Sequence, residues 1–244
     1  MPGSRAATAP GRRARRMDAL ILAGGLGTRL RAVVKDRAKS VAEIGGRPFL
    51  AHVLDRLARS AEIKRVILCV GHRADTVREA LGTRHGRLAI AYSEEDRPLG
   101  TGGALRLAAR RFGVERTALA MNGDTFFGAR IDSLLAFHRA ERAAATLALA
   151  RVPDASRYGR VECSGNRVDA FLEKGAGGPA WISAGLYVFS PSAWRSLAAL
   201  PAACSLEHDA FPRWLGTMRV AGYRTRSAHL DIGTPEDFSR AGGG

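Results

Sequence analysis

The sequence contains little cysteine and no long hydrophobic run. Its three cysteines, Cys69, Cys163 and Cys204, are odd in number, far apart and without the spacing of metal ligands. This argues against a disulfide framework and favours a reducing compartment, so we expect a cytoplasmic protein in which Cys69 is a small core residue. The longest apolar stretches are only as long as a strand, and we expect neither a transmembrane helix nor a membrane partner.

Aromatic residues are also scarce, at 7% of the chain, and no recognised nucleic-acid-binding motif is present. Both observations argue against nucleic acid as the main partner. The formal net charge of +15 still indicates an anionic partner, since nucleoside triphosphates, sugar phosphates and nucleic acids are all drawn to such a field. A nucleic-acid-binding protein is therefore kept as an alternative, and it predicts salt-dependent binding that weakens when residues 1–16 are removed.

Acidic residues are absent from residues 1–16, which contain five arginines together with Ala, Pro and Gly. This segment has no apolar region of the kind found in signal peptides, and it precedes Met17. We expect a disordered basic extension, with a transit peptide or a nucleic-acid-binding arm as alternatives. Residues 17–244 show no internal repeat and no linker-like change of composition, which favours a single domain.

What the chain does contain, from Ala19 onward, is an alternation of short apolar runs and amphipathic segments. This pattern predicts an α/β fold with a Rossmann-like mixed, mostly parallel sheet flanked by helices. The expected strands are 19–23, 65–70, 88–92 and 118–121, and the expected helices are 50–57, 75–81 with Asp75 as its cap, 102–112 and 131–142. Further β-type segments at 158–171 and 181–189 extend the sheet, and Phe211 and Trp214 indicate a helix over the core.

A glycine-rich turn, Gly24-Gly25-Leu26-Gly27-Thr28-Arg29, follows the first expected strand. Backbone N–H groups in such a turn can approach phosphate oxygens because no Cβ atom intervenes. A Walker loop would end in Gly-Lys-Ser/Thr and a dinucleotide fingerprint would have a third glycine at Leu30, so neither motif fits. Arg29 and Lys39 instead supply cations that can clamp phosphates and stabilise departing pyrophosphate. The alternative is a structural turn beside two solvated cations.

A second polar motif, Asn122-Gly123-Asp124, follows the expected strand 118–121. Ligands of open α/β sheets bind at the carboxyl ends of the strands, so the glycine turn and Asp124 are expected to share one crevice.

Together these motifs resemble the sugar 1-phosphate nucleotidyltransferases, and within that family the D-glycero-D-manno-heptose 1-phosphate and mannose 1-phosphate guanylyltransferases. The resemblance runs from about Asp18 to Phe238. Its landmarks are Ala23-Gly24-Gly25-Leu26-Gly27-Thr28-Arg29-Leu30, Pro98-Leu99-Gly100-Thr101-Gly102-Gly103-Ala104, Asn122-Gly123-Asp124-Thr125, Tyr158-Gly159, Phe171-Leu172-Glu173-Lys174 and Asp231-Ile232-Gly233-Thr234-Pro235.

The resemblance implies the nucleotide-diphospho-sugar transferase fold, with a nucleotide-binding half at about residues 17–130 and a sugar-phosphate-binding half at about 131–240. It also implies formation of GDP-heptose and pyrophosphate from GTP and D-glycero-D-manno-heptose 1-phosphate, with Mg²⁺ as cofactor. Alternatives are a mannose 1-phosphate guanylyltransferase, a family enzyme using UTP, dTTP, CTP or ATP, or a non-catalytic sensor of nucleotide sugars. The chain could also form a homo-oligomer.

Roles for individual residues follow from the resemblance. The catalytic residues are Arg29 and Lys39, and the metal ligands are Asp124 and Asp231. The nucleotide-binding residues are Leu22, Ala23, Gly24, Gly25, Gly27, Thr28, Gly100, Thr101, Gly102, Asn122 and Gly123. The sugar-phosphate-binding residues are Tyr158, Gly159, Glu173, Lys174 and Ser183.

Structural roles are the alternatives for several of these residues. Asp124 could form a turn, Asp231 could cap a helix, and Thr101 could cap the helix that follows it. Tyr158 could be a core residue beside a turn glycine.

The sequence departs from the family pattern at two positions. Lys39 is followed by Ser40 where the family usually has proline, so we expect Lys39 to be less firmly held. Ser183 occupies a position that is commonly Asn, which weakens one expected sugar contact.

Overall fold

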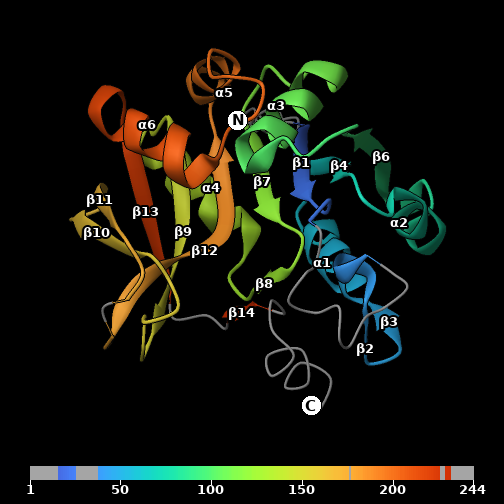
Figure 1. The fold of residues 1–244 in the computed structure, drawn as a ribbon, viewed down its shortest axis with the longest axis horizontal. Coiled ribbons are helices and arrows are strands. Elements are labelled where there is room, and N and C mark those ends of the chain that lie inside the picture. Colours follow the sequence, from blue (N-terminus) through green and yellow to red (C-terminus); the bar gives the residue numbers. More distant parts are fainter. Residues whose placement is uncertain (1–15, 26–37, 176, 226–228, 232–244) are drawn as a thin grey trace, which may run out of the picture.

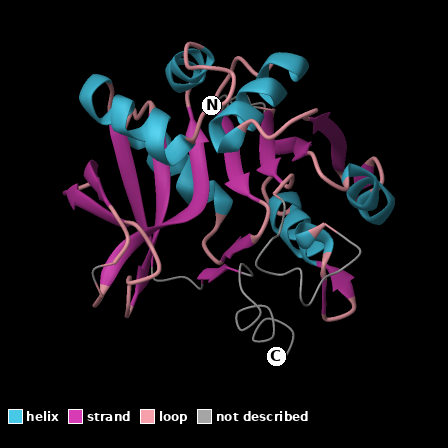
Figure 2. Cartoon of the chain, in the orientation of Figure 1, coloured by secondary structure: helices cyan, strands magenta, loops and turns pink. Residues whose placement is uncertain are grey.

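Ten strands form one continuous sheet in the computed structural model, which describes residues 16–25, 38–175, 177–225 and 229–231 (Figures 1 and 2). Most of the expected N-terminal extension lies outside these described residues, as do Gly27, Thr28 and Arg29. Across the sheet the order is β10 (Arg160–Ser164), β11 (Arg167–Leu172), β13 (Val220–Thr225), β9 (Ala145–Val152), β12 (Ala180–Phe189), β7 (Ala118–Asn122), β1 (Met17–Leu22), β4 (Ile63–Val70), β6 (Leu88–Glu94) and β5 (Arg84–His85).

Parallel pairing is confined to two parts of this sheet. β6, β4, β1 and β7 are joined in parallel, and so are β9 and β13. β12 runs antiparallel to both of its neighbours, β7 and β9, and the β10–β11 hairpin is also antiparallel. The expected mixed α/β sheet is confirmed, but mostly parallel pairing holds only for the first half. In the second half, β12 lies between β7 and β9 and runs opposite to both, so no parallel crossover connection joins it to either neighbour.

Helices cover both faces of the sheet. Apolar side chains of α1 (Phe49–Ala58), α2 (Ala74–Leu81) and α4 (Ile131–Ala140) join one buried cluster, and those of α3 (Gly100–Phe112), α5 (Pro191–Ala198) and α6 (Phe211–Thr217) join another. Phe211 and Trp214 are buried in the second cluster, which confirms the predicted covering helix. Two covered faces explain why Ala19, Leu20 and Ile21 form an unbroken apolar run.

Two helix starts differ from those expected. Asp75 is not the cap of α2, because that helix begins at Ala74 and its N-cap is Arg73, in a left-handed conformation with φ 61°. α3 begins at Gly100, and Thr101 lies inside it instead of capping it. In both cases the polar side chain adjacent to the helix start has other partners, so local propensity alone misplaced the boundary.

The cysteines and one histidine have packing roles. All three cysteines are free thiols, and Cys69 is buried as expected. Burial raises the pKa of the Cys69 thiol, which favours its neutral form. His138 on α4 is only 4% exposed, and its Nδ1 atom lies 2.8 Å from Thr146 Oγ1. Burial also lowers the pKa of His138 to about 4, so this residue is neutral at pH 7.

Short elements surround the main sheet. A 3₁₀ turn, Lys39–Val41, precedes the small ladder of β2 (Glu43–Ile44) and β3 (Arg47–Pro48), and β8 (Thr125–Phe127) pairs with β14 (His229–Asp231) below the sheet in Figure 1. Within the described ranges, no helix combines the length and apolar character needed to cross a membrane.

Candidate active site

A cavity of about 780 Å³ lies at the carboxyl ends of β1, β4, β6 and β7. These strands end level with one another, because Leu22 pairs with both Cys69 and Asn122, and Val70 pairs with Glu94. The cavity lining includes the following predicted site residues: Leu22, Ala23, Gly24, Gly25, Lys39, Gly100, Thr101, Asn122, Gly123 and Asp124. The expected shared crevice between the glycine turn and Asp124 is therefore present.

The glycines of this cavity have different physical roles. A Cβ atom on Gly24 would lie 3.0 Å from Gly71 N, so glycine permits two loops to approach closely. A Cβ atom on Gly123 would lie 2.6 Å from Leu22 O, to which the Gly123 N–H already donates. Gly123 thus joins β7 to β1, whereas a Cβ atom on Gly25 would meet nothing within 4 Å. The Gly25 backbone is the part of the described turn that faces open space.

Lys39 and Asp124 form an ion pair in the cavity. The distance from Lys39 Nζ to Asp124 Oδ2 is 2.7 Å, and the two side chains are 15% and 37% exposed. Lys39 begins the 3₁₀ turn, and the hydroxyl of the buried Ser40 lies 3.5 Å from Ala23 O, at the start of the glycine turn. This ion pair is one contact that holds Lys39, which no proline follows.

Strand pairing places Asp231, the second predicted metal ligand, close to Asp124 in the backbone register. The antiparallel register of β8 and β14 sets Asp231 opposite Thr125, the residue next to Asp124. Two aspartates that are 107 positions apart in the sequence are thereby placed on paired strands, with Asp231 opposite the residue that follows Asp124. Asp124 is not merely a turn residue, since its carboxylate pairs with Lys39 and its other oxygen accepts a hydrogen bond from Thr125 Oγ1 at 3.3 Å.

The segment from Gly100 to Ala104 opens α3 beside the cavity. Thr101 Oγ1 accepts a hydrogen bond from Leu206 N and donates one to Glu207 Oε2, so it does not serve as the helix cap. Gly102 lies outside the cavity lining, because a Cβ atom there would meet Cys204 Sγ at 2.9 Å. Gly100 and Thr101 line the cavity, whereas Gly102 does not.

Sequence reasoning missed the cavity residues on the loops after β4 and β6, which are Gly71, His72, Glu95, Asp96 and Arg97. Ser40, Cys69, Pro98 and Ala104 were named in the sequence analysis without a binding role, and they also line the cavity. Glu95 is half-buried, and its Oε2 atom accepts a hydrogen bond from Leu99 N at 3.3 Å. Burial raises the pKa of the Glu95 carboxyl above its usual range. The polar run after strand 88–92 was the available signal, since the carboxyl-end rule applied to Asp124 fits Glu95 equally well.

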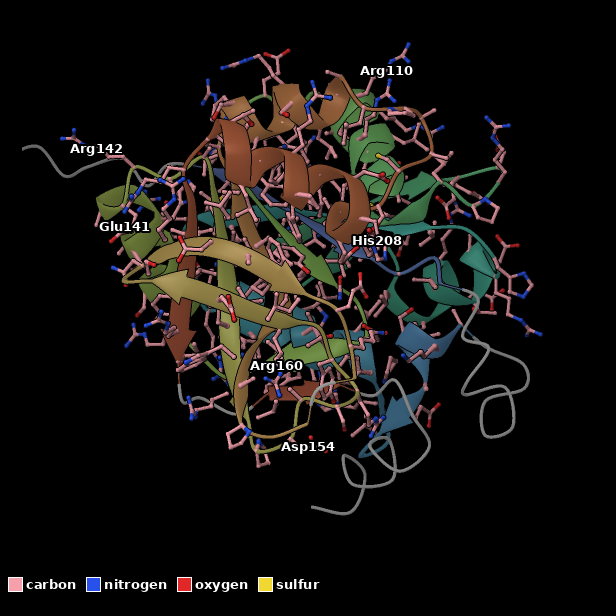
Figure 3. All side chains as sticks on the ribbon, turned by 60° about the vertical axis from the view of Figure 1, so that its left-hand side comes forward. Arg110, Glu141, Arg142, Asp154, Arg160 and His208 are labelled. Atoms are coloured by element: carbon pink, nitrogen blue, oxygen red, sulfur yellow. The ribbon has the colours of Figure 1, made fainter. Side chains whose placement is uncertain are left out.

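The predicted sugar-phosphate residues do not line this cavity. Glu173 and Lys174 are exposed on the turn after β11, and Tyr158 packs at the edge of the first buried cluster. A Cβ atom on Gly159 would lie 3.2 Å from Leu172 O, at the base of the β10–β11 hairpin. Figure 3 shows Asp154 and Arg160 near this hairpin, at the lower rim of the second half.

Ser183 lies on β12, the strand of the second half that pairs with β7. Its hydroxyl donates to Tyr187 OH at 3.1 Å, across an irregularity where the β12–β9 register shifts. Gly185, in the same irregularity, has φ 66° and lies against Asn122, where a Cβ atom would come within 2.8 Å of Asn122 Nδ2. The second half therefore contacts the cavity through this bend in β12.

Comparison with known proteins identifies relatives along most of the chain. The family model described as Nucleotidyl transferase matches residues 18–242. The chain is 34% identical over 225 residues to the D-glycero-alpha-D-manno-heptose 1-phosphate guanylyltransferase of Aneurinibacillus thermoaerophilus, which covers 92% of this chain and 96% of that protein. It is 39% identical over 231 residues to a mannose-1-phosphate guanylyltransferase of Mycobacterium tuberculosis, again over 92% of this chain but 63% of that protein.

Solved structures agree with these relatives. HddC from Yersinia pseudotuberculosis has a TM-score of 0.79 and 30% identity, over 92% of this chain and 97% of that one. The same protein complexed with GMP-PN has a TM-score of 0.78 and 29% identity, with the same coverage. The nucleotide-diphospho-sugar transferase fold that the resemblance implied is thereby confirmed.

Proposed function

This chain belongs to the nucleotidyl transferase family, and from that membership we propose that it joins GTP to D-glycero-D-manno-heptose 1-phosphate, releasing pyrophosphate and forming GDP-heptose. The general activity of this chain is that of a sugar 1-phosphate nucleotidyltransferase. The observation that carries the proposal is the convergence of the Gly25 backbone, Lys39 and Asp124 in one cavity at the ends of four parallel strands. A nucleotide-sized space with a glycine turn, a cation and a carboxylate suits a triphosphate and its counter-ion.

In the proposed reaction, an oxygen of the sugar 1-phosphate attacks the α-phosphorus of the triphosphate. A new P–O bond forms, and the bond from the α-phosphorus to the bridging oxygen breaks, so that pyrophosphate leaves with the electron pair. A phosphate monoester with a second pKa of about 6 is mostly dianionic at pH 7 and needs no general base. The protein must supply positioning and charge neutralisation.

The described residues supply both. The Gly25 backbone faces the cavity without a side chain, and Lys39 can move its ammonium from Asp124 to a phosphate oxygen when substrate binds. Arg29, which lies outside the described residues, keeps its predicted role as a second clamp on the leaving group.

The carboxylates fit a magnesium ion. Asp124 already has a cation 2.7 Å from its Oδ2 atom, and the β8–β14 register brings Asp231 beside it. Among the side chains that the structure describes, no group of three or more His, Cys, Asp or Glu is arranged to hold a metal. Mg²⁺ needs only one or two carboxylates when phosphates and water complete its shell, so Asp124 and Asp231 suffice. When bound, the ion would neutralise phosphate charge.

Glu95 supports guanine as the base. Its carboxylate lies in the same cavity, next to Gly24 and Gly71. A carboxylate accepts hydrogen bonds but donates none, which suits the adjacent N1–H and N2–H groups of guanine and not the N1 acceptor of adenine. The heptose and mannose relatives are both named as enzymes that transfer guanylyl groups, and the HddC complex contains GMP-PN.

The heptose is proposed on the similarity to the Aneurinibacillus enzyme, which this chain covers almost completely. Tyr158, Gly159, Glu173, Lys174 and Ser183 are proposed to bind the sugar phosphate. Since none of them lines the cavity described above, they form a separate subsite that reaches it through the bend in β12.

The test is pyrophosphate release from five nucleoside triphosphates, each combined with heptose, mannose and glucose 1-phosphates in the presence of Mg²⁺. We expect product chiefly from GTP with the heptose. A preference for mannose 1-phosphate would move the assignment to the mannose enzymes, and a preference for UTP or dTTP would overturn the guanylyl assignment. Binding of the nucleotide without turnover of any pair would favour a sensor.

Asp124→Asn is the matched variant in this assay. It preserves size and removes the charge, so we expect pyrophosphate release to fall at least about a hundredfold while the melting temperature changes little. Full activity of Asp124→Asn at saturating Mg²⁺ would refute the metal-holding role.

A further inference from the structure

A loop of the second half is hydrogen-bonded to the start of α3, beside the cavity. We call residues 202–207 the strap. The strap follows α5 and includes the first two residues of a π-helical turn at Leu206–Ala210. The Cys204 carbonyl accepts hydrogen bonds from Gly102 N at 2.9 Å and Gly103 N at 3.0 Å, and Cys204 N donates to Leu99 O at 2.9 Å. The N–H groups of Gly102 and Gly103 at the start of α3 are thus bonded to the strap and are not available to bind a phosphate.

The glycines of the Leu99–Ala104 segment make room for the strap. A Cβ atom on Gly103 would lie 2.4 Å from Ala202 O, and one on Gly100 would lie 2.6 Å from Cys204 O. Gly100 also has φ 75°, a conformation that side chains disfavour. All three glycines of this segment, Gly100, Gly102 and Gly103, therefore have the strap backbone against them.

Thr101 is the residue of this segment that connects the strap to the cavity. It lines the cavity, and its hydroxyl donates to Glu207 Oε2 at 2.9 Å while accepting from Leu206 N at 2.8 Å. Glu207 Oε2 also accepts a hydrogen bond from Ser205 Oγ at 2.9 Å. One carboxylate oxygen therefore holds both the strap turn and the cavity-facing threonine.

Glu207 is exposed and also interacts electrostatically with the second half. It lies close enough to the buried Tyr187 to contribute, after burial itself, to raising the pKa of that phenol. The adjoining His208 is exposed where the turn leads into α6 (Figure 3). Glu207 thus links the strap, which leads into α6, to Thr101 at the start of α3.

We propose that Glu207 is a positioning residue for nucleotide binding, which holds Thr101 and the first turn of α3 in place so that the cavity is preformed for the base and ribose. The proposal rests on the nucleotide-binding function proposed above, and it adds a contribution from the second half to the nucleotide site. Holding a binding segment in its bound conformation reduces the ordering cost of binding.

The experiment measures equilibrium binding of a fluorescent GTP analogue, together with steady-state kinetics, for Glu207→Ala, Glu207→Gln and Asp209→Asn. Glu207→Ala should raise Kd and KM for the nucleotide about threefold to tenfold, with kcat and the KM of the sugar phosphate changed less than twofold. Glu207→Gln should recover most of the affinity, because the amide oxygen still accepts from Thr101. Asp209→Asn removes one charge from the same turn, where Asp209 accepts from Ser205 N, and should leave nucleotide affinity unchanged.

A double-mutant cycle isolates the contact. Thr101→Val and Glu207→Ala should be less than additive in nucleotide affinity, since either change alone breaks the same hydrogen bond. Unchanged Kd in Glu207→Ala, equal weakening in Asp209→Asn, or strict additivity in the cycle would each overturn the proposal. If the wild-type protein binds no nucleotide, the proposed function fails instead, so the two failures are distinguishable.

Discussion

At the scale of single residues, two of the carboxylates that line the cavity, Asp124 and Glu95, have different surroundings. Asp124 is paired with Lys39, while Glu95 accepts a hydrogen bond from the backbone N–H of Leu99, and burial raises the pKa of Glu95. The first environment suits a metal ligand. The second suits a group whose charge is satisfied by ligand donors, such as the N–H edge of guanine.

Glu95→Gln should therefore weaken GTP binding, because an amide offers one acceptor in place of a carboxylate with two. We expect KM for GTP to rise about tenfold or more, and the preference for GTP over ATP and UTP to fall by a similar factor. Steady-state kinetics with each nucleotide measures both effects. Glu94→Gln is the matched control, since Glu94 bonds to Arg78 away from the cavity lining.

The same residue gives a pH dependence of definite sign. Ionised Glu95 is the form that accepts from guanine, so GTP affinity should decrease as the pH falls through its raised pKa. Bound guanine stabilises the carboxylate, and nucleotide binding in that pH range should release protons. The Glu95→Gln protein should show neither this decrease nor this release. An identical pH profile in both proteins would contradict the role of Glu95.

At the scale of elements, the sequence was informative wherever local pattern decides the structure. The apolar runs at 19–23, 65–70 and 118–121 each coincide with a strand of the sheet, except that β1 ends at Leu22. The carboxyl-end rule placed the described part of the glycine turn and Asp124 in one cavity. Hydrophobic periodicity is a property of neighbouring residues, so it can be read from one segment at a time.

Contacts between distant segments could not be predicted in this way. One example is the position of β12 between β7 and β9, and another is the set of hydrogen bonds from the strap to α3. Both depend on backbone groups that come together only in the folded chain. Gly102 illustrates the difficulty, because a glycine selected for packing against Cys204 has the same sequence signal as one selected for a ligand.

The junction of β1 with β7 gives an element-scale prediction. In Gly123→Ala the new Cβ atom would lie 2.6 Å from Leu22 O, so the end of β7 must move and carry Asp124 with it. We expect a loss of about 1–3 kcal/mol in the free energy of unfolding and a fall in kcat of more than tenfold. Denaturant titration and pyrophosphate release measure the two quantities.

Gly216→Ala is the control for this prediction. Gly216 lies in α6, and a Cβ atom there would meet nothing within 4 Å. Alanine should leave activity unchanged and stabilise the helix slightly, by up to about 1 kcal/mol. Equal activity in the two variants would show that the β1–β7 junction does not position Asp124.

At the scale of the whole molecule, the two halves share one sheet. β12 of the second half pairs with β7 of the first along Leu186–Phe189, and both buried clusters contain residues from both halves. The strap adds hydrogen bonds across the same boundary. Neither half can be removed without exposing a strand edge and one side of each cluster, so we predict that the described parts of both halves unfold as one cooperative unit.

The tryptophans allow this cooperativity to be tested. All three, Trp181, Trp194 and Trp214, lie in the second half, so intrinsic fluorescence reports that half, whereas far-ultraviolet circular dichroism reports helices and strands of both. Because shared strands and clusters would have to separate before either half could unfold alone, the two signals should give coincident denaturant transitions with equal midpoints and slopes. A fluorescence transition at lower denaturant than the dichroism transition would mean that the second half unfolds first. In that case the strap contacts would be lost in the intermediate, and nucleotide affinity should fall in step with fluorescence.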